Sequence, residues 1–361
     1  MAFDNIIGQQ RVKLFFERAL ASDRLSHAYL FVGDRGVGKE AMALEWAKAL
    51  LCSYQKNGHP ANCADCNRIA KFNHPDVHFL FPAPAKAKED ELKKIISSIA
   101  EDPYNRLELW ANPSISIERI REIRQTSAYK SFEGQGRVVI VCDCERMTIE
   151  AANALLKILE EPPPKMYIIM ISSRPNLLLP TITSRCQLVK FDPLAAGEIE
   201  VALAARAGVA KEQARLTARL ASGSYRRALE LLDENLQEMQ SRALEFFRKS
   251  VQNEVAQVQF IEEVLIDCQR DLKKIRDLLI LLALWLRDAM LFGEGGQTNS
   301  ELLINYNQSD VFKKFVQSCP QADLFGAVGE IEKSLQLMDR NVQINLILIV
   351  LMNKLRTFLR R

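Results

Sequence analysis

The stretch of residues 33–40 constrains the fold of this chain more than any other. Its sequence, GDRGVGKE, has the spacing G-x-x-x-x-G-K of a phosphate-binding P-loop. A β-rich run at residues 28–32 precedes the loop and a helical run at residues 41–47 follows it, which is the order that the motif requires. The loop glycines are Gly33, Gly36 and Gly38. This context predicts a nucleotide-binding α/β domain, and the alternative is a glycine-rich turn that only connects a strand to a helix.

Two side chains of the loop carry its chemistry. Lys39 is placed to reach the terminal phosphates of a nucleotide, while backbone N–H groups and the helix dipole favour bound phosphate. Glu40 stands where the motif has Ser or Thr, so a hydroxyl that normally holds Mg²⁺ becomes a carboxylate beside a triphosphate. We therefore expect binding of ATP and magnesium to be weak or lost.

A second apolar run, residues 138–142, ends in Asp143, which fits a metal-binding Walker B aspartate. The next position needs a carboxylate that activates water, and Cys144 cannot serve as that base. Glu145 follows, where strand alternation turns it to the other side. The sequence predicts that hydrolysis is absent or very weak. The alternative role for Asp143 is to cap a helix that begins near Met147.

The order of apolar runs predicts the fold class. Short strand candidates alternate with helical segments in the amino-terminal half, which favours a parallel sheet covered by helices. The candidates are residues 28–32, 78–81, 138–142, 167–172 and 188–191. After these, amphipathic helices continue to the end of the sequence. We expect an α/β domain at residues 1–193, a small helical domain at 194–240 and a helical bundle at 241–361. Residues 82–112, rich in lysine and acidic residues, look like an exposed insertion.

Charge and hydropathy exclude other classes. A net charge of +3 over 361 residues is too small for bulk electrostatic binding to nucleic acid. The chain also lacks a basic stripe with interleaved aromatics, which disfavours a zinc-dependent nucleic-acid-binding protein. The first residues show no signal-peptide pattern, and the apolar runs at 278–286 and 344–352 are about half the roughly 18 residues that cross a bilayer. We expect a cytoplasmic protein without membrane contact.

Three of the eight cysteines form a candidate metal site. Cys63 and Cys66 make a C-x-x-C pair, and Cys52 precedes them across a polar segment. Tetrahedral zinc accepts Cys and His, and a C-x-x-C knuckle is a common half-site. Four other cysteines fit small buried apolar residues: Cys142, Cys186, Cys268 and Cys319.

Two later stretches carry a family resemblance. Residues 153–163, NALLKILEEPP, and residues 182–186, ITSRC, are similar to the AAA+ clamp-loader subunits of DNA replication. Further matches extend this resemblance over nearly the whole chain, at residues 8–10, 26–28, 74–76 and 223–228. Within that family, Cys144 and the altered P-loop resemble the delta-prime subunits of bacterial DNA polymerase III, and not its ATP-hydrolysing gamma/tau subunits. The resemblance implies an AAA+ P-loop domain, a helical lid domain and a helical collar.

By that resemblance, Arg185 is an arginine finger, presented in trans to ATP on the adjacent gamma/tau subunit. Phosphoryl transfer spreads negative charge over the transferring group, and a forked, permanently charged guanidinium stabilises it. The alternative is an ion pair between Arg185 and Glu160 or Glu161. Ser173 and Arg226 occupy the sensor positions of the family.

The resemblance also implies the function and the partners. The chain completes the loader ring with gamma/tau and delta subunits and helps to load the sliding clamp on primed DNA, without hydrolysing ATP itself. The competing hypothesis is an autonomous ATPase of the gamma/tau type, in which Glu40 or Glu145 replaces the usual groups.

Structural zinc in the excursion near residues 52–66 is a further implication. Family members that carry zinc have a fourth cysteine three residues before the C-x-x-C pair, where this chain has Pro60. His59 is adjacent and is our candidate for the fourth ligand beside the three cysteines. His74 is a poorer candidate because it belongs to a His-Pro-Asp turn.

Overall fold

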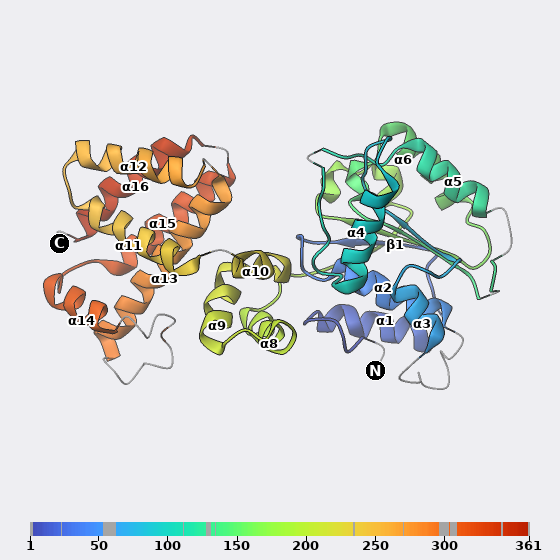
Figure 1. Cartoon of the computed structure of the whole chain (residues 1–361), viewed down its shortest axis with the longest axis horizontal. Coiled ribbons are helices and arrows are strands. Elements are labelled where there is room, and N and C mark those ends of the chain that lie inside the picture. The colour runs from blue at the N-terminus through green and yellow to red at the C-terminus, as the bar shows by residue number, and fades with distance from the viewer. Residues whose placement is uncertain are drawn as a thin grey trace. The chain divides into compact units, whose positions relative to one another are not determined.

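The computed structural model describes residues 3–22, 24–52, 63–110, 112–127, 131–133, 135–233, 235–269, 271–295, 303, 309–340 and 342–359. The chain forms two compact units (Figure 1). One comprises Met1–Gly208 with Ala221–Leu229, and the other comprises Val209–Leu220 with Glu230–Arg361. The division into three domains at residues 193 and 240 stays a prediction.

A five-stranded parallel sheet in the order β2-β3-β4-β1-β5 is the centre of the first unit. The strands are β1 (Ala28–Val32), β2 (Val77–Leu80), β3 (Arg137–Val141), β4 (Met166–Ser172) and β5 (Gln187–Lys190). The predicted strands agree with these bounds to within one residue at each end. The parallel α/β fold predicted from the sequence is therefore confirmed.

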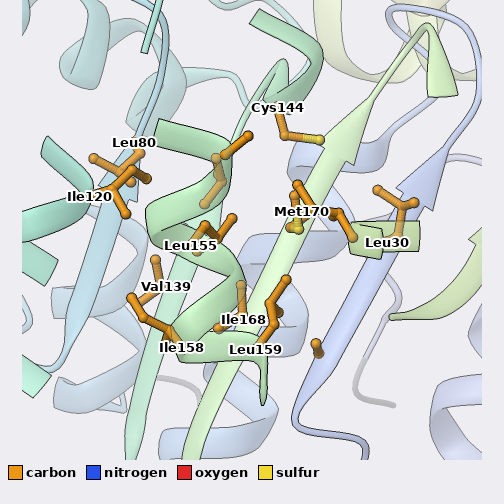
Figure 2. Packing of buried hydrophobic residues seen from close by; sticks show 14 of the residues in the cluster. Leu30, Leu80, Ile120, Val139, Cys144, Leu155, Ile158, Leu159, Ile168 and Met170 are labelled. Carbon is orange, nitrogen blue, oxygen red and sulfur yellow. The ribbon is translucent and has the colours of Figure 1, made fainter. Parts of the chain in front are cut away.

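Helices cover both faces of this sheet (Figure 1). One face packs against α5 (Ile117–Ser127) and α6 (Ile149–Glu160), where Leu30, Val139 and Met170 of the strands meet Leu155 of α6 (Figure 2). Successive residues of a strand point to opposite faces, so neighbouring residues of β1 face the other layer. The apolar runs of the strands are therefore buried on both sides, as is typical of parallel sheets.

The opposite face of β1 carries an aromatic cluster. The ring centroids of Phe31 and Phe16 are 5.6 Å apart, and those of Tyr29 and Trp46 are 5.7 Å apart. Phe16 belongs to α1 (Gln10–Ser22) and Trp46 to α2 (Lys39–Leu51). This packing fixes α2, and with it the loop that leads from β1 into α2.

Three strands deliver the candidate nucleotide residues to one edge of the sheet. β1 leads into the P-loop, β3 into Asp143 and β4 into Ser173. These strands are neighbours in the order β3-β4-β1, and ligands of open α/β sheets bind beyond the carboxyl ends of the strands. The topology therefore places these residues where a nucleotide site belongs.

The segment of residues 82–112 is only in part an exposed insertion, so that prediction is wrong for its buried residues. Its lysines are exposed, but Ile95 and Ile99 on one face of α4 (Glu89–Glu101) are buried. Beyond α4, Tyr104 and Arg106 are 4% and 7% exposed. Apolar residues four apart on a helix share a face, and this face anchors α4 so that the residues after it reach the edge of the sheet.

Among the described residues, the second unit contains helices and no strand. Its helices are α9 (Lys211–Leu220), α11 (Leu236–Ser250), α12 (Glu254–Asp267), α13 (Leu272–Gly295), α14 (Ser309–Ser318), α15 (Leu324–Asp339) and α16 (Ile344–Leu359). α13 packs against α11, α14 and α15. None of the helices in the described part of the chain is long and apolar enough to cross a membrane.

The remaining short elements lie in the first unit or at its boundary. They are α3 (Ala64–Ala70), η1 (Cys144–Arg146), η2 (Pro175–Leu177), α7 (Pro180–Thr183), α8 (Ala196–Ala207) and α10 (Tyr225–Leu232). α10 begins in the first unit and ends in the second.

Candidate functional site

The P-loop has the backbone that its glycines predict. Gly36 and Gly38 have φ of 76° and 99°, a left-handed region that favours glycine, and Gly38 is the residue that caps the amino terminus of α2. Lys39 is 2% exposed, and its Nζ donates to the carbonyl oxygens of Gly33 at 2.8 Å and Asp34 at 2.5 Å. The lysine amine is therefore bound by the loop's own backbone.

Asp143 is 5% exposed and forms a buried ion pair with the guanidinium of Arg106. Arg35 of the P-loop approaches the same carboxylate at 3.9 Å. Burial alone would raise the pKa of Asp143, but the two guanidinium groups outweigh it and hold the pKa below its usual value. As they stand, the residues around Asp143 do not fit a magnesium ion, because a guanidinium already takes the carboxylate.

The alternative role for Asp143 is wrong, because another residue caps the helix that follows. α6 begins at Ile149, and the side chain of Thr148 accepts a hydrogen bond from the backbone N–H of Ala151. The Asp143 side chain makes no such bond to η1.

Neither residue after Asp143 is placed as a free general base. Cys144 is 1% exposed within the core of the sheet (Figure 2), and burial raises the pKa of its thiol well above the usual value. Glu145 accepts hydrogen bonds from the backbone N–H of Ser173 at 3.1 Å and from its Oγ at 2.9 Å. The predicted sensor residue Ser173 is thus paired with the carboxylate that the competing ATPase hypothesis needs for water.

Arg226, the second predicted sensor residue, lies beside the P-loop. The backbone N–H of Tyr225 donates to the carbonyl of Gly36 at 3.0 Å, and a side chain at Gly36 would overlap Ser224 and Arg226. The guanidinium of Arg226 pairs with Glu108 at 3.0 Å. The structure therefore brings Arg226 together with the P-loop, and its sensor role stays a prediction.

Sequence reasoning missed Arg106 and Glu108. Both lie in the segment that was interpreted as an exposed insertion, and their partners are 37 and 118 positions away. The structure shows buried Tyr104 and Arg106 alternating with exposed Asn105 and Leu107. The residue types Tyr-Asn-Arg-Leu do not alternate between apolar and polar, so the sequence carries no signal of this burial.

Arg185 lies apart from these residues, in the turn between α7 and β5. Its guanidinium donates to the carbonyl oxygen of Thr181 at 2.9 Å and pairs with Glu160 at 2.9 Å. The side chains of Arg185 and Glu160 are 37% and 48% exposed. The alternative ion pair with Glu160 therefore forms, and it lies at the surface. The role of Arg185 as an arginine finger stays a prediction.

Cys52, Cys63 and Cys66 come together as the sequence predicts. Their Sγ atoms all lie within 4.8 Å of one another, and those of Cys52 and Cys63 are 3.4 Å apart. Burial alone would raise the pKa of Cys63, but hydrogen bonds from the Cys66 backbone and the Cys52 side chain outweigh it and hold the pKa below its usual value. The pKa of Cys66, in contrast, is raised by burial and by its hydrogen bonds with the other two thiols. A thiolate is the form that binds metal, and the three sulfurs are close enough to share one ion.

Of the two histidine candidates, only His74 is described, and it is not among the clustered residues. His59 and Pro60 lie outside the described residues. His74 contacts Glu133 through Nε2 at 3.1 Å and accepts from the Asp76 backbone through Nδ1. Of the remaining cysteines, Cys142 is buried as predicted. The prediction is wrong for the half-buried thiols Cys186, Cys268 and Cys319.

Comparisons with known proteins agree with this geometry. A family model described as "DNA polymerase III, delta subunit" matches residues 8–195, which is more than half of the chain. Over 193 residues the chain is 34% identical to DNA polymerase III subunit delta' of Bacillus subtilis, covering 53% of this chain and 50% of that protein. Over 233 residues it is 31% identical to subunit delta' of Pseudomonas aeruginosa, covering 64% and 63%.

Two more distant matches complete the comparison. DNA polymerase III subunit tau of Bacillus subtilis is 29% identical over 238 residues, with coverage of 64% of this chain and 37% of that protein. The match to a solved DNA polymerase III gamma subunit-related protein from Thermotoga maritima covers 95% of this chain and 98% of that chain. The sequence identity is 19% and the TM-score is 0.37. The chain spans about half the length of the first relative named above.

A parallel sheet with a P-loop after β1 and an aspartate after β3 defines an AAA+ type of P-loop protein. The match over residues 8–195 is more specific. The chain belongs to the DNA polymerase III delta subunit family.

Proposed function

We propose that this chain is a delta-prime-type clamp-loader subunit that does not hydrolyse ATP and that supplies Arg185 to a neighbour's ATP. The neighbour is a gamma/tau subunit, and the delta subunit is a further member of the ring. The assembled loader acts in the cytoplasm and places the sliding clamp on primed DNA. The identity with proteins named delta' supports this choice of subunit.

The state of Arg185 is the observation that carries the proposal. Its guanidinium is exposed, and its ion partner Glu160 is exposed as well. Exposed ion pairs contribute about 0–1 kcal/mol, so a nucleotide on another chain can replace Glu160 at little cost. An arginine that stabilises phosphoryl transfer in trans needs this combination of fixed backbone and exchangeable side-chain partner.

The chain's own site supports the absence of hydrolysis. Cys144 is buried with a raised pKa, Glu145 is bonded to Ser173, and Asp143 is paired with Arg106. None of these groups is placed to activate water. The competing hypothesis of an autonomous ATPase finds no support in this arrangement.

Reconstitution of the loader tests the trans role. Arg185→Ala should leave the chain folded and able to join gamma/tau and delta, yet slow ATP turnover at the facing site by about 10³ or more. Arg11→Ala is a matched control, because Arg11 is also exposed, pairs with Asp192 at 3.3 Å and donates to a carbonyl, that of Lys190. DNA-stimulated ATP turnover and clamp loading on primed DNA are the measurements.

The outcomes separate the two roles of Arg185. Normal assembly with lost clamp loading in Arg185→Ala, and normal loading in Arg11→Ala, supports the finger. Wild-type loading by Arg185→Ala would show that Arg185 is only the partner of Glu160.

We also propose that Cys52, Cys63 and Cys66 hold a structural zinc ion with His59 as the fourth ligand. The proximity of the three sulfur atoms supports it. Elemental analysis should find about one equivalent of zinc, and Cys63→Ser should release it and destabilise the excursion. Cys319→Ser, which changes a half-buried thiol elsewhere, should keep the metal. Wild-type protein that contains no zinc, and whose stability does not change when zinc is added, would contradict the proposed zinc site.

A further inference from the structure

Residues 104–108 place charged and aromatic side chains over the P-loop and Asp143. This segment follows α4 and is held in place by its own hydrogen bonds. The backbone N–H of Leu107 donates to Ser98 Oγ at 3.0 Å, and that of Tyr104 donates to Asp102 Oδ1 at 2.9 Å. The phenol oxygen of Tyr104 accepts from the backbone N–H of Ile7 at 2.8 Å. The segment is therefore a fixed part of the first unit.

Arg106 takes the place that a divalent cation has in a working site. It is 7% exposed and pairs with Asp143, the aspartate after β3. Burial lowers the pKa of Arg106, but the charge of Asp143 and, further, that of Glu40 raise it above its usual value. Glu40 stands at the hydroxyl position of the P-loop, so the two positions that normally hold Mg²⁺ both act on this guanidinium.

Glu108 takes the place of a phosphate. Its carboxylate Oε1 accepts from Arg35 of the P-loop at 2.9 Å and from Arg226 at 3.0 Å. Guanidinium groups bind carboxylates and phosphates in the same way. Burial alone would raise the pKa of Glu108, but Arg35, Arg226 and Arg106 hold it below its usual value, so the anion is the favoured form.

Tyr104, at the start of the same segment, packs directly against the P-loop. A Cβ atom at Gly38 would lie 2.9 Å from the phenol oxygen of Tyr104.

We propose that the chain fills its own nucleotide site, with Arg106 in place of the metal ion and Glu108 in place of a phosphate. The inference deepens the proposed function, because it gives a second cause for the absent ATPase besides the missing base. It also predicts that the site can be opened by substitution in the segment of residues 104–108.

Binding of a fluorescent ATP analogue to the full isolated chain tests this inference. The deciding variant is Arg106→Gln with Glu108→Gln, because glutamine keeps hydrogen bonds and bulk but removes both charges. Glu101→Gln, an exposed carboxylate at the end of α4, is the matched control. Titrations are run with Mg²⁺ and with EDTA, and far-UV circular dichroism checks folding. Where the double variant does not fold, Glu108→Gln alone decides in EDTA, since Glu108 is partly exposed.

The double variant should bind the analogue at least tenfold more tightly than the control, and Mg²⁺ should strengthen its binding because Asp143 is released. A folded variant that gains less than tenfold would overturn the inference. Wild-type chain that binds the analogue as tightly as the variant, without turnover, would also overturn it and leave the proposed function intact. ATP turnover by the wild-type chain would contradict both this inference and the proposed absence of hydrolysis. Normal clamp loading by Arg185→Ala would contradict only the role of Arg185 in trans.

Discussion

Two arginine–carboxylate pairs in the same α/β unit differ most in their burial. Arg106 and Asp143 have side chains that are 8% and 7% exposed, whereas those of Arg185 and Glu160 are 37% and 48% exposed. Each pair joins a guanidinium to one carboxylate near the end of a strand or helix. Their surroundings decide what each can do.

Burial makes the first pair permanent and leaves the second exchangeable. Removing one partner of a buried pair strands a charge away from water, which costs about 3–5 kcal/mol. An exposed pair is solvated before and after it opens and contributes about 0–1 kcal/mol. In our two proposals, the same chemical pair closes the chain's own site and, at Arg185, keeps a guanidinium ready for another chain.

The largest expected effect concerns the exchangeable pair. Arg185→Lys keeps the charge but loses the planar fork that bonds phosphate oxygens in two places. We expect the ATP site that faces this chain to slow by about 10³, nearly as much as in the alanine variant. DNA-stimulated turnover of the reconstituted loader measures it. Near-wild-type turnover with Arg185→Lys would show that a point charge is sufficient and that the planar guanidinium of Arg185 is not required.

Stability gives the second contrast. Arg106→Ala should lower the free energy of unfolding by about 3–5 kcal/mol, because Asp143 stays buried without its partner. Glu160→Ala, which opens the surface pair, should change it by about 1 kcal/mol or less. Urea titration followed by circular dichroism compares the two. Equal losses of unfolding free energy in the two variants would show that the buried and the surface pair do not differ in their contribution to stability.

Acid should weaken the buried pair, because it protonates Asp143. The pKa of Asp143 is lowered in the folded chain, so its charged form stabilises the fold above the unfolded value of about 3.9 and this contribution is lost as pH falls through the lower folded value. Asp143→Asn should therefore be less stable than wild type at neutral pH, with the gap closing below about pH 4. Urea titrations at a series of pH values measure the gap. A gap that stays constant down to pH 2 would mean that the pair contributes no charge-dependent stability.

The sequence predicted what depends on local pattern and missed what depends on distant pairing. All five strands and the P-loop follow from runs of neighbouring residues, and Cys63 and Cys66 from a four-residue motif. The Arg106–Asp143 and Glu108–Arg226 contacts join residues 37 and 118 positions apart. Nothing in the sequence of residues 82–112 indicates that the arginine of this segment is buried, because burial of a charge depends on the partner that the fold supplies.

The smallest expected effect is that Lys39→Ala does not change ATP turnover by the isolated chain. In a working P-loop this lysine binds phosphate, and its loss abolishes activity. Here Lys39 bonds to the carbonyl oxygens of Gly33 and Asp34, Cys144 stands at the base position, and Arg106 holds Asp143. Cys144→Glu should not restore full activity either, since a new carboxylate leaves Glu40 and Arg106 in place. Turnover assays of wild type, Lys39→Ala and the exposed-lysine control Lys86→Ala make the test. A rate of about 1 per second, ordinary for an enzyme, that is lost only in Lys39→Ala would show that the chain's own site works, and the contrast between a closed site and an exchangeable arginine would fail.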